Sequence, residues 1–512
     1  MEVSRKEKEE LLRKVSSLVE QKYFDPRFDV PKWRSVVDAR TATILNGGSA
    51  AEFEQQMHDL VSQLGSSHTA FYHRNWRPLP PRQSICATLQ QCETHDDGLR
   101  WMLQDVQDGG PAHGVGLEKG DLLIRIDGEE IRPPGRVLLK PGRTTKLEVR
   151  RADGTRASFE IQIPLLKPKQ PFSTPQAVIS SKLEPNIGYL KINMFPGMVG
   201  IDVAREIDRA IASFRDCDRM IVDLRGNSGG GIGGLRLMSY LTPDKLPIGY
   251  SLSRSRAQKG YKKEELTRFE RIPSRKIALL WLALRYGFGD HSIALFTEGL
   301  GPQKFHGRIV LLLNEHSASA SEMVAAFASE NALAKIVGTT TPGRLVGSKP
   351  FKLSHGYFLI LPVGAYLTWQ GRRLEGEGIK PDLDMPLSYE SISNVQNNQL
   401  RGRNPNRQRL LEAHRWCDGR LDPRYTRRVA VSQARRAVKR SNEVLSAINR
   451  ISLLALACDR WDGRIPVRWD YSWVAAAWTM DRVQIAKIRQ SRRWRMQRRL
   501  SGPTTSAPTL GA

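Results

Sequence analysis

The chain has few cysteines for its length, and their spacing excludes two common uses of this residue. Five cysteines occur among 512 residues, and they stand at positions 86, 92, 217, 417 and 458. Because their number is odd and no Cys-x-x-Cys pair is present, a disulfide framework and a structural zinc site are both disfavoured. We therefore expect neither a metal nor another cofactor.

Long hydrophobic segments are also missing. The apolar run IALLWLAL at 277–284 is far too short to span a bilayer. The N-terminal stretch MEVSRKEKEELLRKVSSLVEQKYF is charged and amphipathic, without the apolar centre of a signal peptide. These features predict a soluble, cytoplasmic protein with no membrane partner, or an exported one if the start codon is misassigned.

Acidic residues are scarce in the last part of the chain. Residues 391–512 hold 25 Lys and Arg against 8 Asp and Glu, which accounts for most of the net charge of +26. This segment also holds six of the eleven Trp. Interleaved Arg and Trp can bind nucleic acid by neutralising phosphates and stacking on bases. Because no known nucleic-acid motif is present, a helical cap or a poorly ordered extension is the favoured interpretation.

Hydrophobic periodicity divides the chain into four segments. A helical region is expected first, with an apolar stripe at 11–19 and a second helix at 49–64. Short strands and turns follow, then alternating strands and helices, then the basic extension. The predicted domains are 1–80, 84–165, 177–390 and 391–512.

The third segment predicts an α/β fold. Its strands are expected at 186–195, 219–225, 308–313 and 356–363, and its helices near 200–214, 231–241 and 320–332. Continuous apolar strands that alternate with helices are typical of a sheet covered on both faces.

The stretch NEHSASASEMVAA, residues 314–326, places three serines just before an expected helix. Ser319 and Glu322 have the spacing of a capping box, which by itself only starts a helix. A serine hydroxyl also serves as a nucleophile where a neighbouring base removes its proton. Whether Ser319 is a nucleophile therefore depends on finding that base elsewhere in the chain.

The stretch DGGPAHGVGLEKGDLLIRIDGEEI, residues 108–131, resembles the most recognisable part of a PDZ domain. Leu122, Ile124 and Ile126 alternate and are expected to point inward, and Asp127-Gly128 predicts a hairpin turn. A generic small β-domain is the alternative. The PDZ resemblance implies binding of extended peptides by strand addition.

Three further motifs resemble the S41 serine peptidases, which include the C-terminal processing peptidases and the catalytic half of tricorn protease. They are MIVDLRGNSGGG at 220–231, SASASE at 317–322 and LEGEGIKPDLD at 374–384, and the resemblance extends over about 1–388. It implies a multidomain α/β protein with a ClpP/crotonase-like core that hydrolyses peptide bonds in unfolded proteins or peptides. It also implies polypeptide substrates and a possible homo-oligomer.

The resemblance makes Ser319 the nucleophile, but the lysine base of the processing peptidases is replaced. The matching position in TTTPGRLVGS is Arg344, and Lys349 lies five residues further on in a different context. A guanidinium keeps its proton at physiological pH and cannot act as a base. Arg344 is instead a candidate for binding a substrate carboxylate as a bidentate donor.

The tricorn branch implies a different base. The stretch LGSSHT supplies Ser67 and His68, and LEGEGIKPD supplies Glu375, with Glu377 as the alternative. By this resemblance His68 accepts the proton of Ser319, Ser67 hydrogen-bonds the imidazole, and the glutamate supports Ser67. His316, close to Ser319 in sequence, is interpreted as a loop histidine.

The turn GNSGGG at 226–231 is the expected oxyanion hole. Glycines let backbone N–H groups approach a substrate oxygen closely. The resemblance pairs an N–H of Gly229 or Gly230 with that of Ala320. A phosphate loop is disfavoured because the Gly-Lys-Ser/Thr ending is missing. The alternative function is a catalytically inactive, PDZ-containing peptide-binding protein on the same scaffold.

Overall fold

The computed structural model describes residues 3–386, except for 74–77, 95, 166–175, 198–199, 232, 274–291, 303–304 and 306–307. The basic extension and the IALLWLAL run lie outside the described residues. Among the described helices, none combines the length and the hydropathy needed to cross a bilayer.

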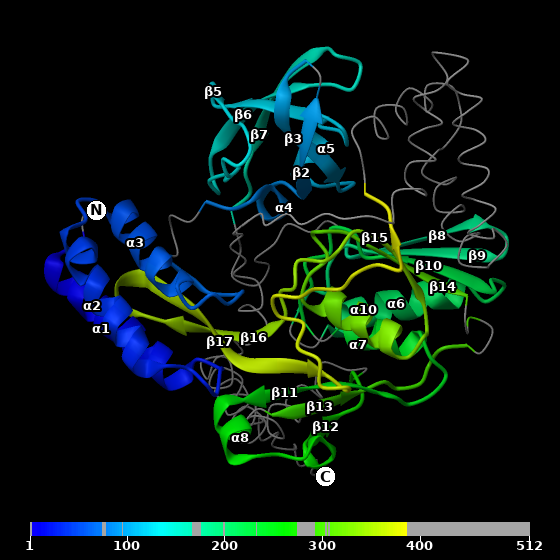
Figure 1. The fold of residues 1–512 in the computed structure, drawn as a ribbon. Helices are drawn as coiled ribbons and strands as arrows, with labels where there is room; N and C mark the ends of the chain where they lie inside the picture. Colours follow the sequence, from blue (N-terminus) through cyan, green and yellow to red (C-terminus); the bar gives the residue numbers. More distant parts are fainter. Residues whose placement is uncertain are drawn as a thin grey trace, which may run out of the picture.

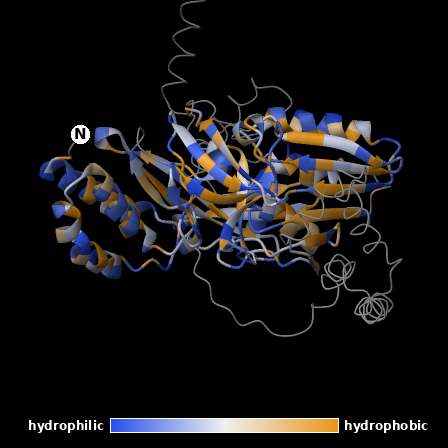
Figure 2. Ribbon diagram, turned by 90° about the horizontal axis from the view of Figure 1, so that it is seen from above, coloured by the Kyte–Doolittle hydropathy of each residue, from blue (hydrophilic) through white to orange (hydrophobic). Residues whose placement is uncertain are grey.

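Three helices form the N-terminal region: α1 (Arg5–Lys22), α2 (Val30–Asn46) and α3 (Ala50–Ser62). A polar side chain caps the start of each, namely Ser4, Asp29 and Ser49, because each accepts a hydrogen bond from the first turn. The apolar stripe that begins at Leu11 is buried with residues of β16 (Val346–Lys352) and β17 (Tyr357–Thr368). The three helices lie beside these two strands in Figure 1, and Figure 2 shows orange, hydrophobic stretches along the helices. The helices predicted around 11–19 and 49–64 are therefore confirmed.

A second body is a sheet with the order β2-β3-β4-β6-β7, with β5 paired to β4. It lies apart from the other layers at the top of Figure 1. Its elements are α4 (Pro81–Ser84), β2 (Ala87–Thr94), β3 (Gly98–Val106), α5 (Pro111–Gly114), β4 (Leu122–Ile126), β5 (Glu129–Glu130), β6 (Thr144–Arg150) and β7 (Arg156–Gln162).

The predicted inward alternation along β4 is wrong in part. Leu123 packs into the main core of this sheet, whereas Leu122 and Ile124 form a small cluster on its other face. The strand is irregular between Leu123 and Arg125. This shift returns Ile126 to the main-core side. The hairpin at Asp127-Gly128 is confirmed by the β4–β5 pairing and by positive φ angles at both residues.

The third body contains two sheets with helices between them. One has the order β18-β15-β14-β10-β9-β8, and the other has the order β1-β17-β11-β13-β12 with β16 paired to β17. The first sheet comprises β8 (Val178–Glu184), β9 (Ile187–Ile192), β10 (Arg219–Asp223), β14 (Ile309–Leu313), β15 (Lys335–Gly338) and β18 (Leu383–Asp384). The second comprises β1 (Ala70–His73), β11 (Pro247–Ser253), β12 (Thr267–Phe269), β13 (Ile293–Phe296), β16 (Val346–Lys352) and β17 (Tyr357–Thr368). Helices α6 (Ile201–Ser213), α7 (Gly234–Tyr240) and α10 (Ala320–Glu330) share one core cluster with both sheets, whereas the short α8 (Arg254–Lys259) contacts β11 and β17.

The predicted α/β class is confirmed, but the described helices cover only one face of the first sheet, which is parallel except for β8. Val222, Leu311 and their neighbours face α6, α7 and α10. Residues such as Ile221 and Val310, which alternate with them, form a smaller buried cluster without helical members. The strand predicted at 356–363 is also longer than expected and belongs to the second sheet, where it joins β1 to β11.

Candidate active site

Ser319 lies where β14 has ended and α10 begins, and its backbone is unusual. It has φ 57° and ψ −116°, a conformation that costs a non-glycine residue about 1–3 kcal/mol. The residue is 5% exposed. Its N–H donates to a carboxylate oxygen of Glu322 at 3.0 Å and to the carbonyl oxygen of Arg344 at 3.0 Å. Strain of this kind persists only where surrounding contacts enforce it.

Ser67, His68 and Glu375 are brought together from opposite ends of the described chain. The Ser67 hydroxyl lies 2.7 Å from His68 Nδ1 and donates to Glu375 Oε2 at 2.9 Å. The Ser67 N–H donates to the other oxygen of Glu375 at 2.6 Å. Glu377 is exposed on the same turn. The geometry therefore favours Glu375 over Glu377 as the supporting carboxylate.

This arrangement determines which imidazole nitrogen is basic. The Ser67 hydroxyl donates its one hydrogen bond to Glu375. Its contact with His68 must therefore be one in which the Ser67 oxygen accepts from Nδ1–H. We assign the neutral tautomer with its lone pair on Nε2 accordingly. Burial, and to a lesser extent the positive charge of Arg344, lower the pKa of His68 from 6.5 to about 3. The imidazole is therefore neutral at physiological pH.

The segment Gly343–Leu345 contacts both halves of the site. The N–H groups of Gly343 and Arg344 donate to Glu322, the residue that also holds Ser319. The N–H of Leu345 donates to Glu375 at 2.8 Å. Within the described part of the chain, His68 and Ser319 are not hydrogen-bonded to each other directly. Catalytic hydrogen bonds of free enzymes are often long and tighten when substrate binds.

The glycine turn between β10 and α7 lies directly against Ser319. A Cβ at Gly229 would stand 2.6 Å from Cβ of Ser319 and 2.8 Å from the nitrogen of Ala320. Glycine is therefore required there for steric reasons. The N–H of Gly229, however, donates to the side chain of Asn227 at 2.8 Å, which removes it as an oxyanion donor.

Gly230 and Ala320 remain as the candidate oxyanion donors. Phe195 donates its N–H to the carbonyl of Gly229 and accepts from the N–H of Gly231. Gly230 is the bridge partner of Phe195, so in this parallel pairing its own N–H points away from that residue. Ala320 is the first residue of α10, where an N–H has no intrahelical acceptor.

The remaining charged candidates are placed as follows. Arg344 is partly exposed beside His68, and Lys349 is exposed on β16. His316 Nε2 lies 2.9 Å from the carbonyl oxygen of Leu89, so its ring is turned toward the β2–β7 sheet.

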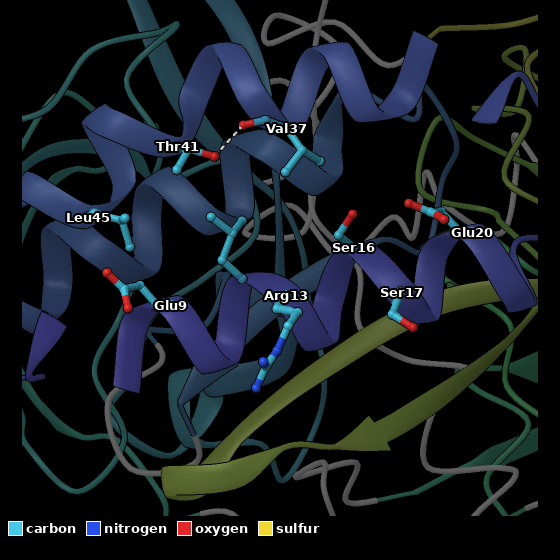
Figure 3. Close-up of a pocket in the computed structure, with 9 residues that line it drawn as sticks. Glu9, Arg13, Ser16, Ser17, Glu20, Val37, Thr41 and Leu45 are labelled. Carbon is cyan, nitrogen blue, oxygen red and sulfur yellow. Dashed lines mark hydrogen bonds between the residues drawn. The ribbon is translucent and has the colours of Figure 1, made fainter. Parts of the chain in front are cut away.

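Among the described residues no cluster of His, Cys, Asp and Glu suits a metal ion. A groove between α1 and α2, lined by residues such as Glu9, contains none of the predicted site residues (Figure 3).

Sequence reasoning missed a polar network that joins the β2–β7 sheet to the turn before Ser319. The side chain of Gln104 on β3 is buried and bonds to Asn314 at 3.0 Å and to Glu315 at 2.7 Å. Lys191 and Asp105 form an ion pair at 3.0 Å across the same interface. These residue types are common on any strand surface, so no signal in the sequence distinguished them.

Comparisons with known proteins find similarity to a family of peptidases. The family model described as peptidase family S41 matches residues 186–385. A carboxyl-terminal-processing protease of Picosynechococcus sp. is 23% identical over 286 residues, which cover 54% of this chain and 59% of that relative. Tricorn protease homolog 1 of Streptomyces coelicolor is 21% identical over 379 residues, which cover 69% of this chain and 31% of that relative. A solved structure of mature CPAF is 15% identical with a TM-score of 0.49, covering 80% of this chain and 99% of that one. The chain thus spans less than two thirds of the length of the two curated relatives.

Proposed function

Because the chain carries a peptidase family S41 domain at residues 186–385, we propose that it is a serine peptidase with a histidine base. The observation that carries the proposal is the hydrogen-bonded series Glu375–Ser67–His68, whose basic nitrogen is left available by the tautomer. The proposed substrates are unfolded proteins or peptides. The range 84–165 is proposed to act as a PDZ-like module that gathers an extended peptide end.

The reaction is an acyl transfer. His68 Nε2 takes the proton of the Ser319 hydroxyl while its oxygen attacks the substrate carbonyl carbon. The oxyanion of the tetrahedral intermediate is stabilised by the N–H groups of Gly230 and Ala320. His68 then gives the proton to the leaving amine, and water repeats the sequence on the acyl-enzyme. Ser67 and Glu375 keep the imidazole oriented and stabilise its charged form, as the aspartate does in a Ser-His-Asp triad.

Activity is expected to persist at acidic pH. Since burial lowers the pKa of His68 to about 3, its protonation should not reduce kcat/KM between about pH 5 and 7, where an ordinary histidine near 6.5 becomes charged. The free energy of unfolding should decrease as the pH is lowered from about 7 to 5, because the unfolded chain takes up a proton at His68 that the folded chain excludes. Profiles of kcat/KM and of urea unfolding against pH measure both effects. A drop in kcat/KM centred near 6.5 with the fold intact would contradict the assignment.

Arg344 is proposed to bind a substrate carboxylate beside the imidazole. Replacing Arg344 by alanine should raise KM about tenfold or more for a peptide with a free C-terminal carboxylate, because a charge-assisted hydrogen bond is lost. The same peptide with an amidated C-terminus is the matched control and should show an unchanged KM. An Arg344→Ala enzyme with the parental KM on both peptides would exclude this role.

A second function is favoured by one observation. Arg344 occupies the position at which the processing peptidases carry their lysine base, so the chain could be a binding protein that retains the scaffold. A fluorophosphonate probe distinguishes the two, since it reacts only with an activated serine. Labelling of Ser319 supports the peptidase. An unlabelled Ser319 together with tight binding of unfolded peptides would support the binding protein.

A further inference from the structure

Three consecutive backbone N–H groups bind two different carboxylates. Gly343 and Arg344 donate to the two oxygens of Glu322 at 2.7 and 2.8 Å, and Leu345 donates to Glu375 at 2.8 Å. Glu322 belongs to the helix that follows the nucleophile, and Glu375 supports the base through Ser67. The segment 343–345 therefore spans the two halves of the site.

Glu322 is the centre of this arrangement. It is fully buried, and each of its oxygens accepts two hydrogen bonds. Oε1 accepts from the Thr341 hydroxyl and the Gly343 N–H, both at 2.7 Å. Oε2 accepts from the N–H groups of Ser319 and Arg344, at 3.0 and 2.8 Å. Four donors are what a buried carboxylate needs to replace its lost hydration.

These contacts exceed what a helix cap requires. The glutamate of a capping box binds the N–H of its own N-cap residue, and the Ser319 contact fulfils that role. The other three donors come from residues 341–344, which follow the helix and the strand β15 in sequence. In addition, the Ser319 N–H donates to the Arg344 carbonyl oxygen, so the nucleophile is joined to this segment twice.

We propose that Glu322 is a positioning residue that fixes Ser319 relative to His68 by holding the segment 343–345 between them. The inference rests on the proposed function, and it deepens that function by naming the group that sets the geometry of nucleophile and base. Glu322 does not touch substrate. It acts on the backbone conformation of Ser319, and hence on the direction of both the hydroxyl and the neighbouring Ala320 N–H.

The change Glu322→Gln tests this role at nearly constant volume. In glutamine, one of the two carboxylate oxygens is replaced by an NH2 group. Whichever oxygen is replaced, the NH2 group faces two donors and can accept a hydrogen bond from neither. Two of the four hydrogen bonds are lost, and the nucleophile and the segment 343–345 separate. A displacement of about 1 Å at a reacting group costs about 100-fold in rate. We expect kcat to fall by about that factor. On casein, whose internal peptide bonds present no C-terminal carboxylate to Arg344, KM should stay within about twofold of the parental value.

The experiment measures kcat and KM on fluorescein-labelled unfolded casein, and the rate at which a fluorophosphonate labels Ser319. Glu330→Gln is the matched control, since it removes a carboxylate from the last residue of the same helix. This control should keep the parental rates, whereas Glu322→Gln should lose about 100-fold in both kcat and labelling. A loss seen in KM alone, with labelling unchanged, would overturn the proposal.

A second pair of variants keeps the test decisive if Glu322→Gln does not fold. Thr341→Val removes one donor to Glu322 and the acceptor of the Ile379 N–H, whereas Thr341→Ser retains both. The valine variant should lose about tenfold in kcat, and the serine variant should stay within about twofold of the parent. Equal activity of the two variants would overturn the proposal.

Failure of the inference and failure of the proposed function give different results. A parent protein that neither hydrolyses casein nor labels at Ser319 overturns both. An active parent beside a folded Glu322→Gln variant with full activity overturns the inference alone.

Discussion

The Ser319→Ala protein is expected to fold normally and to lose hydrolysis of unfolded casein by about 10⁶-fold in kcat, the loss typical of removing a serine nucleophile. The hydroxyl oxygen is the only heavy atom removed, and the alanine methyl group occupies the same place in the turn. The free energy of unfolding should fall by no more than about 2 kcal/mol, the upper cost of removing an N-cap hydroxyl, because contacts of the Ser319 N–H also hold the strained backbone. Casein hydrolysis and urea unfolding of the purified variant measure both effects.

Ser329→Ala is the matched control for this experiment. Ser329 lies on the same helix near its other end and is exposed. Its removal makes the same chemical change without touching the site, so activity should stay at the parental level. Parental turnover in the Ser319→Ala protein would exclude Ser319 as the nucleophile.

The His68→Ala protein is expected to lose activity by a comparable factor. In a serine–histidine system the two side chains act as a unit, so removing either costs about as much as removing both. The double variant Ser319→Ala/His68→Ala should therefore be no less active than either single variant. Initial rates on one peptide substrate, compared across the four proteins, measure this non-additivity.

His316→Gln is the control for the assignment of the base, because His316 lies only three residues from Ser319 in the sequence. His316 is turned toward the carbonyl of Leu89, and glutamine can still donate there. We expect less than a tenfold change in kcat. If His316→Gln were inactive and His68→Ala active, the base would have been assigned to the wrong histidine.

Local structure followed from the sequence where propensity and tertiary contacts agree. The stripe beginning at Leu11, the strand around Val222 and the helix after Ser319 all formed as predicted, because apolar periodicity and caps specify such elements locally. The one-sided covering of the parallel sheet did not follow. A strand reads as the same apolar run whether helices cover both of its faces or only one, so periodicity cannot distinguish the two cases.

The candidate site shows the same division. Motif order nominated Ser67, His68 and Glu375, and the structure brings those three side chains together by hydrogen bonds. The choice between Gly229 and Gly230 could not be made from the sequence. The choice depends on the hydrogen bond from the Gly229 N–H to the side chain of Asn227. Asparagine side chains can bond several backbone groups in a glycine-rich turn, so the sequence does not show which N–H is taken.

Glu322 illustrates a residue whose local pattern was recognised but whose wider role was not. Its spacing from Ser319 predicted a capping box, and the contact to the Ser319 N–H is present. Its contacts to the segment 341–344 depend on how α10 and β15 return the chain, which no short-range pattern encodes. Functional positioning by distant backbone groups is therefore visible only once the fold is known.

The proposed mechanism requires His68, from the N-terminal region, to activate Ser319. The most direct measurement is the second-order rate of fluorophosphonate labelling at Ser319, located by mass spectrometry, in the parent and in His68→Ala. We expect labelling of Ser319 in the parent and a rate at least about 10³-fold lower in the variant, since an unassisted hydroxyl is a weak nucleophile. Equal rates in the two proteins, or labelling at another serine, would contradict it.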